Sequence, residues 1–185
     1  MNDTVFYTGR GDRGDTARLK GEKRVAKSSA LIDVIGTVDE ATSAIGVARA
    51  AAQTETLQRA LPTAQRHLYR LMSHLSATPE TRGDYPGLSE DEVNWLEALI
   101  AELEVNLPPL RDFVLPGDSV AGAAFHMARA VVRRAERRLV AFAETEAHVG
   151  EANLAYMNRL SSLMFVAALH EDMLAGKDPQ LARGS

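Results

Sequence analysis

Residues 119–143, SVAGAAFHMARAVVRRAERRLVAFA, decide the fold class of this chain. Apolar residues in this stretch recur at intervals of three and four, which is the spacing of one face of an α-helix. These residues are Phe125, Ala128, Val132, Ala135, Leu139 and Phe142. Charged residues occupy much of the remaining surface, so one side of the helix is predicted to face a core and another to face solvent or a ligand.

The rest of the chain predicts four more helices. They are expected over residues 28–52, from the residue after Pro62 to 77, from the Ser89 cap to Pro108, and over 151–175. The segment after Ser89 has the clearest start, because Ser89-Glu90-Asp91-Glu92 is a capping box. No segment shows a clear period-two alternation. The prediction is one domain over 1–185: an all-α, ferritin-like bundle of five helices over 28–175, preceded by an irregular arm over 1–27.

The composition limits the kinds of function. The 185 residues include no cysteine, which excludes disulfides, thiolate chemistry and Cys-ligated zinc. The formal net charge of −4 gives no general attraction to nucleic acid or anionic lipid. No apolar run is long enough to span a membrane, and residues 1–7 lack a signal pattern. We therefore expect a cytoplasmic protein with no nucleic-acid and no membrane partner.

The helix over 119–143 carries an unusual charged face. At 100° per residue, Arg129, Arg133, Glu136 and Arg137 fall on one side, and His126 joins them. Arginines at i,i+4 repel one another, which costs about 1 kcal/mol in total. A bound polyanion would offset this cost, and arginine suits bidentate phosphate contacts. The alternatives are a solvated face or a face that pairs with acidic residues in an oligomer. A nucleic-acid interface is disfavoured, because the chain is acidic and no aromatics interleave with the arginines.

The N-terminal arm contains a glycine-rich stretch, YTGRGDRGDT at 7–16. Glycines allow backbone N–H groups to converge on phosphate oxygens, and an aspartate can help hold Mg²⁺. The stretch is neither a Walker A loop nor the turn of a Rossmann unit. A plain turn is the alternative interpretation.

Four blocks in order resemble the PduO-type ATP:cob(I)alamin adenosyltransferases. The first is T-x-x-G-D-x-G-x-T at 8–16, followed by Lys27 and GTVDE at 36–40. The third is FVLPG at 113–117 with H-x-x-R-x-x-x-R-R-x-E-R at 126–137, and the fourth is NRLS at 158–161. The resemblance implies transfer of the 5′-deoxyadenosyl group of ATP to the cobalt of cob(I)alamin, which yields adenosylcobalamin and triphosphate. It also implies a homotrimer with ATP and the corrinoid at subunit interfaces.

The resemblance also implies roles for individual residues. Those implied to bind ATP are Thr8, Gly9, Gly11, Asp12, Gly14, Thr16, Lys27, Arg133, Glu136, Arg137 and Asn158. Those implied to serve catalysis are Arg133, Asp39, Arg129 and Phe113. Asp39 would form a salt bridge with Arg129, and Phe113 would bind the corrinoid beneath the cobalt. No resident metal site is expected. Mg²⁺ would arrive with ATP, and the partners would be a reductase and an adenosylcobalamin-dependent mutase or dehydratase.

The chain departs from the family pattern at several positions. Residues 29–31, 41–43, Asp118 and Ser162 differ from it, and residues 73–79 follow it only loosely. These departures keep open a non-catalytic relative that binds ATP or corrinoid as a sensor or delivery protein. A ferritin-like metal bundle is a second alternative, but the chain contains no Glu-x-x-His motif.

Overall fold

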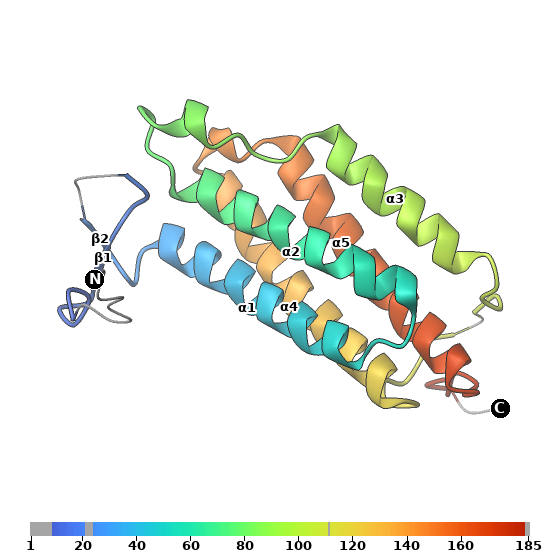
Figure 1. Ribbon diagram of the computed structural model, residues 1–185. Helices are drawn as coiled ribbons and strands as arrows, with labels where there is room; N and C mark the ends of the chain where they lie inside the picture. Colours follow the sequence, from blue (N-terminus) through green and yellow to red (C-terminus); the bar gives the residue numbers. More distant parts are fainter. Residues whose placement is uncertain (1–8, 21–23, 111, 184–185) are drawn as a thin grey trace, which may run out of the picture.

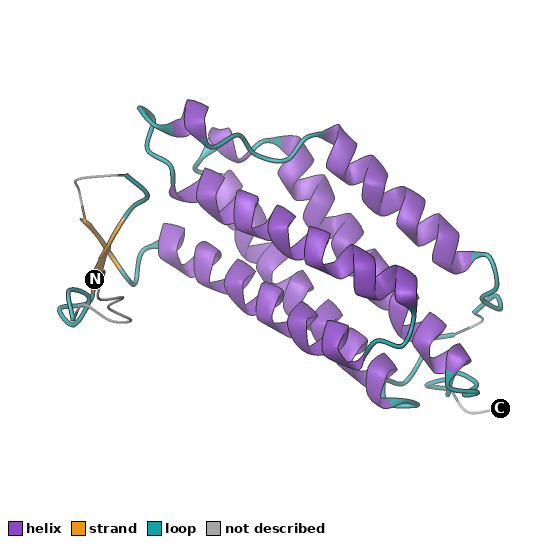
Figure 2. Cartoon of the chain, viewed as in Figure 1, coloured by secondary structure: helices purple, strands orange, loops and turns teal. Residues whose placement is uncertain are grey.

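Five helices, each burying an apolar stripe, form the body of the computed structural model, which describes residues 9–20, 24–110 and 112–183 (Figure 1). The helices are α1 (Ala30–Ala51), α2 (Glu55–Ser76), α3 (Glu90–Glu104), α4 (Val120–Ala143) and α5 (Glu151–Leu174). Two 3₁₀ turns, η1 (Arg82–Asp84) and η2 (Ala147–Val149), lie in the connections. The all-α bundle predicted from the sequence is therefore confirmed (Figure 2).

Helix α4 lies at the centre of the packing, between α1 and α5, while α2 packs on α1 and α3 packs on α5. All six of its predicted apolar positions, from Phe125 to Phe142, are buried. They meet fully buried side chains of α5 such as Tyr156 and Leu160 in one continuous core. The described residues contain no helix that is both long and apolar enough to cross a bilayer.

Helix α2 corrects the sequence prediction at its start. It begins at Glu55 and contains Pro62, which was expected to precede the helix. Proline removes one N–H from the helical ladder. The helix continues through it because Leu57, Leu61 and Leu68 bury one stripe. The helix start is also capped from outside: the Glu171 carboxylate of α5 accepts hydrogen bonds from the backbone N–H groups of residues 53 and 54.

Helices α3, α4 and α5 begin where the sequence predicts them to begin. The capping box at Ser89 is present, with the Glu92 carboxylate accepting from the Ser89 N–H at 2.7 Å. Helix α4 is capped by the Ser119 hydroxyl, which accepts from the Gly122 N–H at 2.9 Å. Helix α5 ends before Gly176, whose φ of 68° suits glycine.

The N-terminal arm is more regular than predicted. It forms a short antiparallel hairpin of β1 (Asp15–Ala17) and β2 (Arg24–Ala26), with Thr16 opposite Val25. Strands of three residues are too short to show a period-two pattern. The Arg24 guanidinium fixes the hairpin by donating to both carboxylate oxygens of Asp15, at 2.8 and 3.0 Å. These hydrogen bonds hold the pKa of the Asp15 carboxyl below its usual value.

Candidate functional site

The seam between α4 and α5 brings together most of the helical residues that the sequence singles out. The two helices run antiparallel, and the Asn158 amide of α5 donates to the Glu136 carboxylate of α4 at 2.8 Å. Farther along, the Arg129 guanidinium lies over the Phe165 ring, 5.4 Å from its centroid. The distance along α4 from position 126 to position 137 is about 16 Å at 1.5 Å per residue. The seam is thus long enough for two adjoining ligands.

The arginines of α4 divide into two rows. Arg134 and Arg138 turn toward α1 and form ion pairs with Glu40 and with Asp33, the latter at 3.2 Å. Arg133 and Arg137 are exposed, and helical period places them on the side of Glu136, which contacts α5. Within the described ranges no carboxylate pairs with either of them. Part of the predicted repulsion is therefore neutralised inside the chain, whereas the charges of the row beside the seam stay exposed.

His126 lies on the same side of α4 as Arg129, as predicted, since both contact Phe165, but it is buried there. Its ring is only 7% exposed and packs edge-on against Phe165, with ring centroids 5.9 Å apart. Helical period places the residue on the arginine side, but the packing of α5 covers that end of the stripe. Burial lowers the pKa of His126, and the nearby Asp172 carboxylate offsets part of this effect. His126 therefore packs against α5 as a buried side chain, and its Nε2 has no hydrogen-bond partner in the described structure.

Phe113 lines a cavity of about 590 Å³ at the end of the seam where Arg129 meets Phe165. The cavity is lined by Asp112, Phe113, Val114, Pro116, His126, Arg129, Phe165 and Arg183. Phe113 is 81% exposed, more than any other aromatic residue that the structure describes. A side chain that staples the loop to the bundle would be buried, so the exposure of Phe113 does not fit that alternative.

The C-terminal segment holds the Phe113 loop in place. The Leu115 N–H donates to the Gln180 carbonyl at 2.8 Å, and the Ala182 N–H donates to the Phe113 carbonyl at 2.7 Å. Asp118, one of the departures from the family pattern, accepts from the Gln180 N–H at 3.2 Å. The ordered loop therefore depends on residues distant in sequence.

Sequence reasoning missed Phe165 and Arg183 in the cavity wall. Phe165 follows Asn158 by seven residues and so shares its helical face, which is a signal that could have found it. Arg183 carries no comparable pattern.

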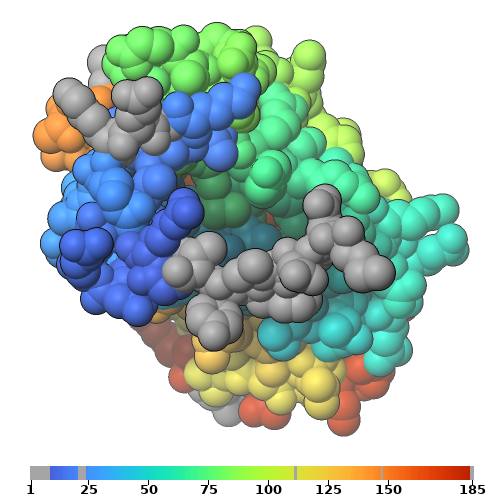
Figure 3. Space-filling model, turned by 60° about the vertical axis from the view of Figure 1, so that its left-hand side comes forward, coloured from blue at the N-terminus to red at the C-terminus, as the bar shows by residue number. Residues whose placement is uncertain are grey.

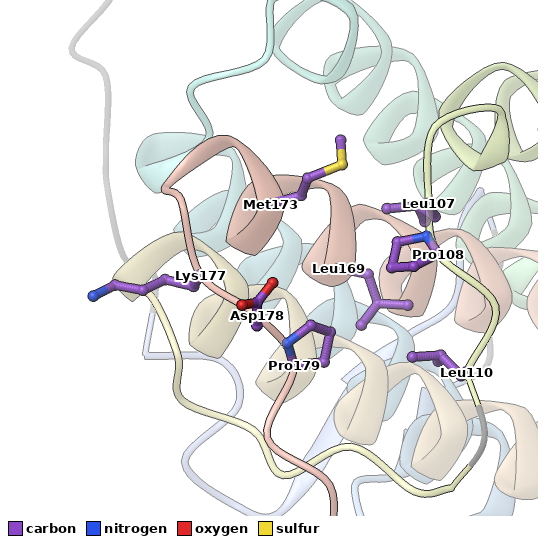
Figure 4. Close-up of a pocket in the computed structure, with 8 residues that line it drawn as sticks. All are labelled: Leu107, Pro108, Leu110, Leu169, Met173, Lys177, Asp178 and Pro179. Carbon is purple, nitrogen blue, oxygen red and sulfur yellow. The ribbon is translucent and has the colours of Figure 1, made fainter.

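A second, small cavity lies beside the Phe113 loop, between residues 107–110 and the end of α5 (Figure 4). Its volume is about 40 Å³, and Leu107, Leu110 and Leu169 contribute to a mostly apolar lining. It has room for a few water molecules. It is too small for a nucleotide or a corrin ring.

The arm gathers the predicted phosphate-binding residues that the structure describes. Gly9, Gly11, Asp12, Gly14 and Thr16 all lie in the loop and the adjoining strand β1, whereas Thr8 lies outside the described residues. The Lys27 N–H donates to the Gly14 carbonyl at 2.8 Å. A Cβ at position 11 would lie 2.9 Å from the Lys27 ammonium, so the lysine side chain lies directly against the backbone of the loop at this glycine.

Two sets of predicted residues stay apart in the single chain. No hydrogen bond or ion pair connects residues 11–20 or 24–27 with α4 or α5. Nor do Asp39 and Arg129 form their predicted salt bridge in the described part of the chain. The ion pairs of Asp33 and Glu40 place Asp39 beside position 134 of the antiparallel α4. Arg129 is about 8 Å farther along that helix.

Comparison with known proteins identifies the family. The model of the family described as cobalamin adenosyltransferase matches residues 6–171. The chain belongs to the cobalamin adenosyltransferase family. The resemblance drawn from the four sequence blocks is thereby confirmed.

Relatives of the cobalamin adenosyltransferase family resemble the chain throughout. The corrinoid adenosyltransferase of Bacillus subtilis is 39% identical over 167 residues, covering 88% of this chain and 84% of that protein. The corrinoid adenosyltransferase PduO of Salmonella typhimurium is 36% identical over 171 residues, or 91% of this chain. The chain spans about half the length of that PduO protein, 50%.

A solved structure of this family shares the fold. It is a phenylalanine-to-alanine variant of the PduO-type ATP:corrinoid adenosyltransferase from Lactobacillus reuteri, complexed with cobalamin and ATP. It superposes with a TM-score of 0.87 at 27% identity and covers 97% of this chain and 100% of that one.

Proposed function

We propose that this chain transfers the 5′-deoxyadenosyl group of ATP to the cobalt of cob(I)alamin and releases triphosphate. One observation carries the proposal. Arg133 and Arg137, which are exposed and pair with no carboxylate of the described residues, lie toward one end of the α4–α5 seam, and the cavity lined by Phe113 lies toward the other end. The arginine end of the seam suits the phosphates of a nucleotide, and the cavity lined by Phe113 suits a corrinoid. Both ligands would lie on one seam, as a transfer between them requires.

The reaction is a displacement at the ribose C5′ carbon. Cob(I)alamin supplies the electron pair for the new cobalt–carbon bond, and the C5′–oxygen bond breaks as triphosphate leaves. No proton transfer by the protein is needed. The chain's task is to position the two substrates and to stabilise the growing negative charge on the leaving group. Arg133, Arg137 and Lys27 are the cations proposed for that charge, and Asn158, held by Glu136, is proposed to contact ATP.

Phe113 has a different proposed role, at the lower face of the cobalt. Cob(II)alamin is hard to reduce while an axial donor holds the metal. An apolar ring in that position excludes the donor and favours reduction, because the surroundings of a metal tune its potential. The exposed ring beside the cavity is the feature that supports this role.

Mg²⁺ is proposed to arrive with ATP. Mg²⁺ in nucleotide sites is commonly bound by one or two carboxylates together with phosphate oxygens. Among the described residues there is no cluster of three or more His, Asp or Glu side chains that could hold a metal by itself. The exposed Asp12 in the glycine loop fits the carboxylate role.

A homotrimer with shared sites is part of the proposal. The separation of the arm from the arginine row within one chain supports it, because a neighbouring copy could supply the missing half. Asp39 is exposed and unpaired in the described structure, and a salt bridge with the Arg129 of another copy would satisfy it. A cytoplasmic location, a reductase that supplies cob(I)alamin and a mutase or dehydratase that takes the product complete the proposal.

A turnover experiment tests the function. The purified chain is given Mg·ATP and chemically reduced cob(I)alamin without oxygen, and adenosylcobalamin and triphosphate are measured together. Equal amounts of the two products are expected. Binding of both substrates without product would instead identify a sensor or delivery protein. Calorimetry with ATP and with cobalamin separately distinguishes that outcome from a failure to bind.

A further inference from the structure

The arm touches the bundle at a place that the proposed reaction does not use. Residues 18–20 lie against the C-terminal end of α2 and the 79–87 connection; Figure 3 shows blue atoms of the arm beside green atoms of this region. Leu19 forms an isolated parallel bridge with Ala77. The contact therefore involves backbone as well as side chains.

Arg18 supplies the most specific part of this contact. Its Nε donates to the Ser76 carbonyl at 3.2 Å and its Nη2 donates to the Ala77 carbonyl at 2.6 Å. The last carbonyls of a helix have no partner within the helix and carry a partial negative charge. The planar guanidinium satisfies two of them at once, which a lysine could not do in the same geometry.

Leu19 and Lys20 strengthen the contact. The Leu19 N–H donates to the Ser76 hydroxyl at 3.1 Å. The Lys20 ammonium lies 3.4 Å from the Asp84 carboxylate and 5.3 Å from the centroid of the Tyr85 ring. Lys20 has a φ of 52°, a left-handed conformation that a lysine rarely adopts without support. The arm therefore turns at Lys20, directly after its contact with the end of α2.

The surface that the arm contacts, at the end of α2, is held in place by His74. The two ring nitrogens of His74 lie 2.9 Å from the Tyr85 carbonyl and 2.9 Å from the His148 carbonyl, so His74 joins the end of α2 to both neighbouring connections. Ser76 and Ala77 belong to residues 73–79, where the chain follows the family pattern only loosely. Arg18 contacts backbone carbonyls in this segment, so only the hydrogen bond to the Ser76 hydroxyl depends on the residue type there.

We propose that Arg18, Leu19 and Lys20 form an arm anchor that positions the ATP-binding loop before nucleotide arrives. Arg18 is its principal positioning residue. The anchor rests on the proposed function of the arm. It reduces the conformational freedom that the loop must lose on binding Mg·ATP, so it acts on nucleotide affinity and leaves the chemical step alone.

Arg18→Ala tests the anchor, with Arg66→Ala as a matched control because Arg66 is an exposed arginine of α2 remote from the arm. We expect Arg18→Ala to speed hydrogen exchange in peptides covering residues 17–20. We also expect it to raise KM for Mg·ATP by about tenfold, the value of one or two net hydrogen bonds. The values of kcat, KM for cobalamin and Tm should stay as in wild type. Arg18→Lys should give an intermediate KM, and Arg66→Ala should change nothing.

Ser76→Ala provides a second approach from the other side of the contact. It should raise KM for Mg·ATP less than Arg18→Ala, and the double variant should fall short of the sum of the two effects, because both act on one contact. Faster exchange with an unchanged KM for ATP would overturn the positioning role. Exchange at residues 17–20 already as fast as in an unfolded chain would overturn the anchor itself. If the wild type binds no nucleotide, the proposed function fails, and the exchange comparison still decides whether the anchor exists.

Discussion

The two arginine rows of α4 have the same residue type on the same helix and differ in what surrounds them. Arg134 and Arg138 are matched by Glu40 and Asp33 of α1. Arg133 and Arg137 lie one position earlier in the chain, and in the described structure no carboxylate matches them. The difference teaches that a charged side chain with a partner within the fold is a stability element, whereas one without a partner is available for a ligand. This contrast makes predictions that can be ordered by size.

The largest effect is expected at the unpaired row. Arg133→Ala should reduce adenosyl transfer by about 10²–10³-fold, the usual loss when one group that stabilises developing charge is removed. The fold should be kept, because the substitution also relieves like-charge repulsion. Steady-state kinetics and thermal unfolding measure the two effects.

Arg134→Ala is the matched control for this substitution. It breaks an exposed ion pair, so a loss of at most about 1 kcal/mol in unfolding free energy is expected, with activity within a few-fold of wild type. If Arg134→Ala abolished activity while Arg133→Ala only lowered stability, the division into two rows would be wrong.

Phe113→Ala tests whether an exposed apolar side chain, like an unpaired arginine, contacts a ligand. We expect ATP affinity to stay nearly unchanged while turnover from cob(II)alamin falls by about tenfold or more, and much more than turnover from pre-reduced cob(I)alamin. The four-coordinate cob(II)alamin signal in electron paramagnetic resonance or magnetic circular dichroism should shrink. Equal losses from both oxidation states with an unchanged spectrum would mean that the ring only packs the loop.

Asp39 and Arg129 extend the comparison between paired and unpaired charges, because they are proposed to pair with each other only between copies of the chain in the assembled protein. Asp39→Asn and Arg129→Ala should each weaken activity. Their double-mutant cycle should show a coupling of about 0.5–3 kcal/mol, as for residues in contact. Kinetics of the two single variants and the double variant measure this coupling. Strictly additive effects would show that the two side chains do not meet between copies.

A smaller effect, on stability alone, is expected for the paired carboxylate of Glu92. Burial raises its pKa, but hydrogen bonds from Ser89 and Arg70 outweigh burial and lower the pKa to about 2. The folded protein thus holds the ionised form more tightly than the unfolded chain, so this stability is present above the ordinary glutamate pKa. It is lost as pH falls toward 2.

Glu92→Gln measures this contribution. The unfolding free energy of wild type should fall between about pH 5 and 2 by about 1–2 kcal/mol more than that of the variant, after allowance for solvent screening. Activity at neutral pH should be the same in both. Parallel pH profiles of denaturant unfolding would show that Glu92 contributes nothing in acid.

Much of the fold could be predicted from local patterns. The period of apolar residues in α4 and the capping box at Ser89 depend on neighbours within four residues, so both were predictable and both are present. The start of α2 was not, because its cap is the Glu171 carboxylate of a helix more than a hundred residues later. The arm hairpin escaped prediction because its strands are too short to show a pattern.

By itself the sequence determined the helical class, the family and which residue types carry chemistry, since these follow from periodicity and from motifs read along one chain. Only the tertiary structure decided how those residues are used. It buried His126 against α5, divided the arginines between α1 and the seam, added Phe165 to the cavity and docked Arg18 on α2. The physical reason is that helical period gives the direction of a side chain around its own axis. The partner that it meets there comes from another helix, and only the packing of the bundle brings that partner within reach.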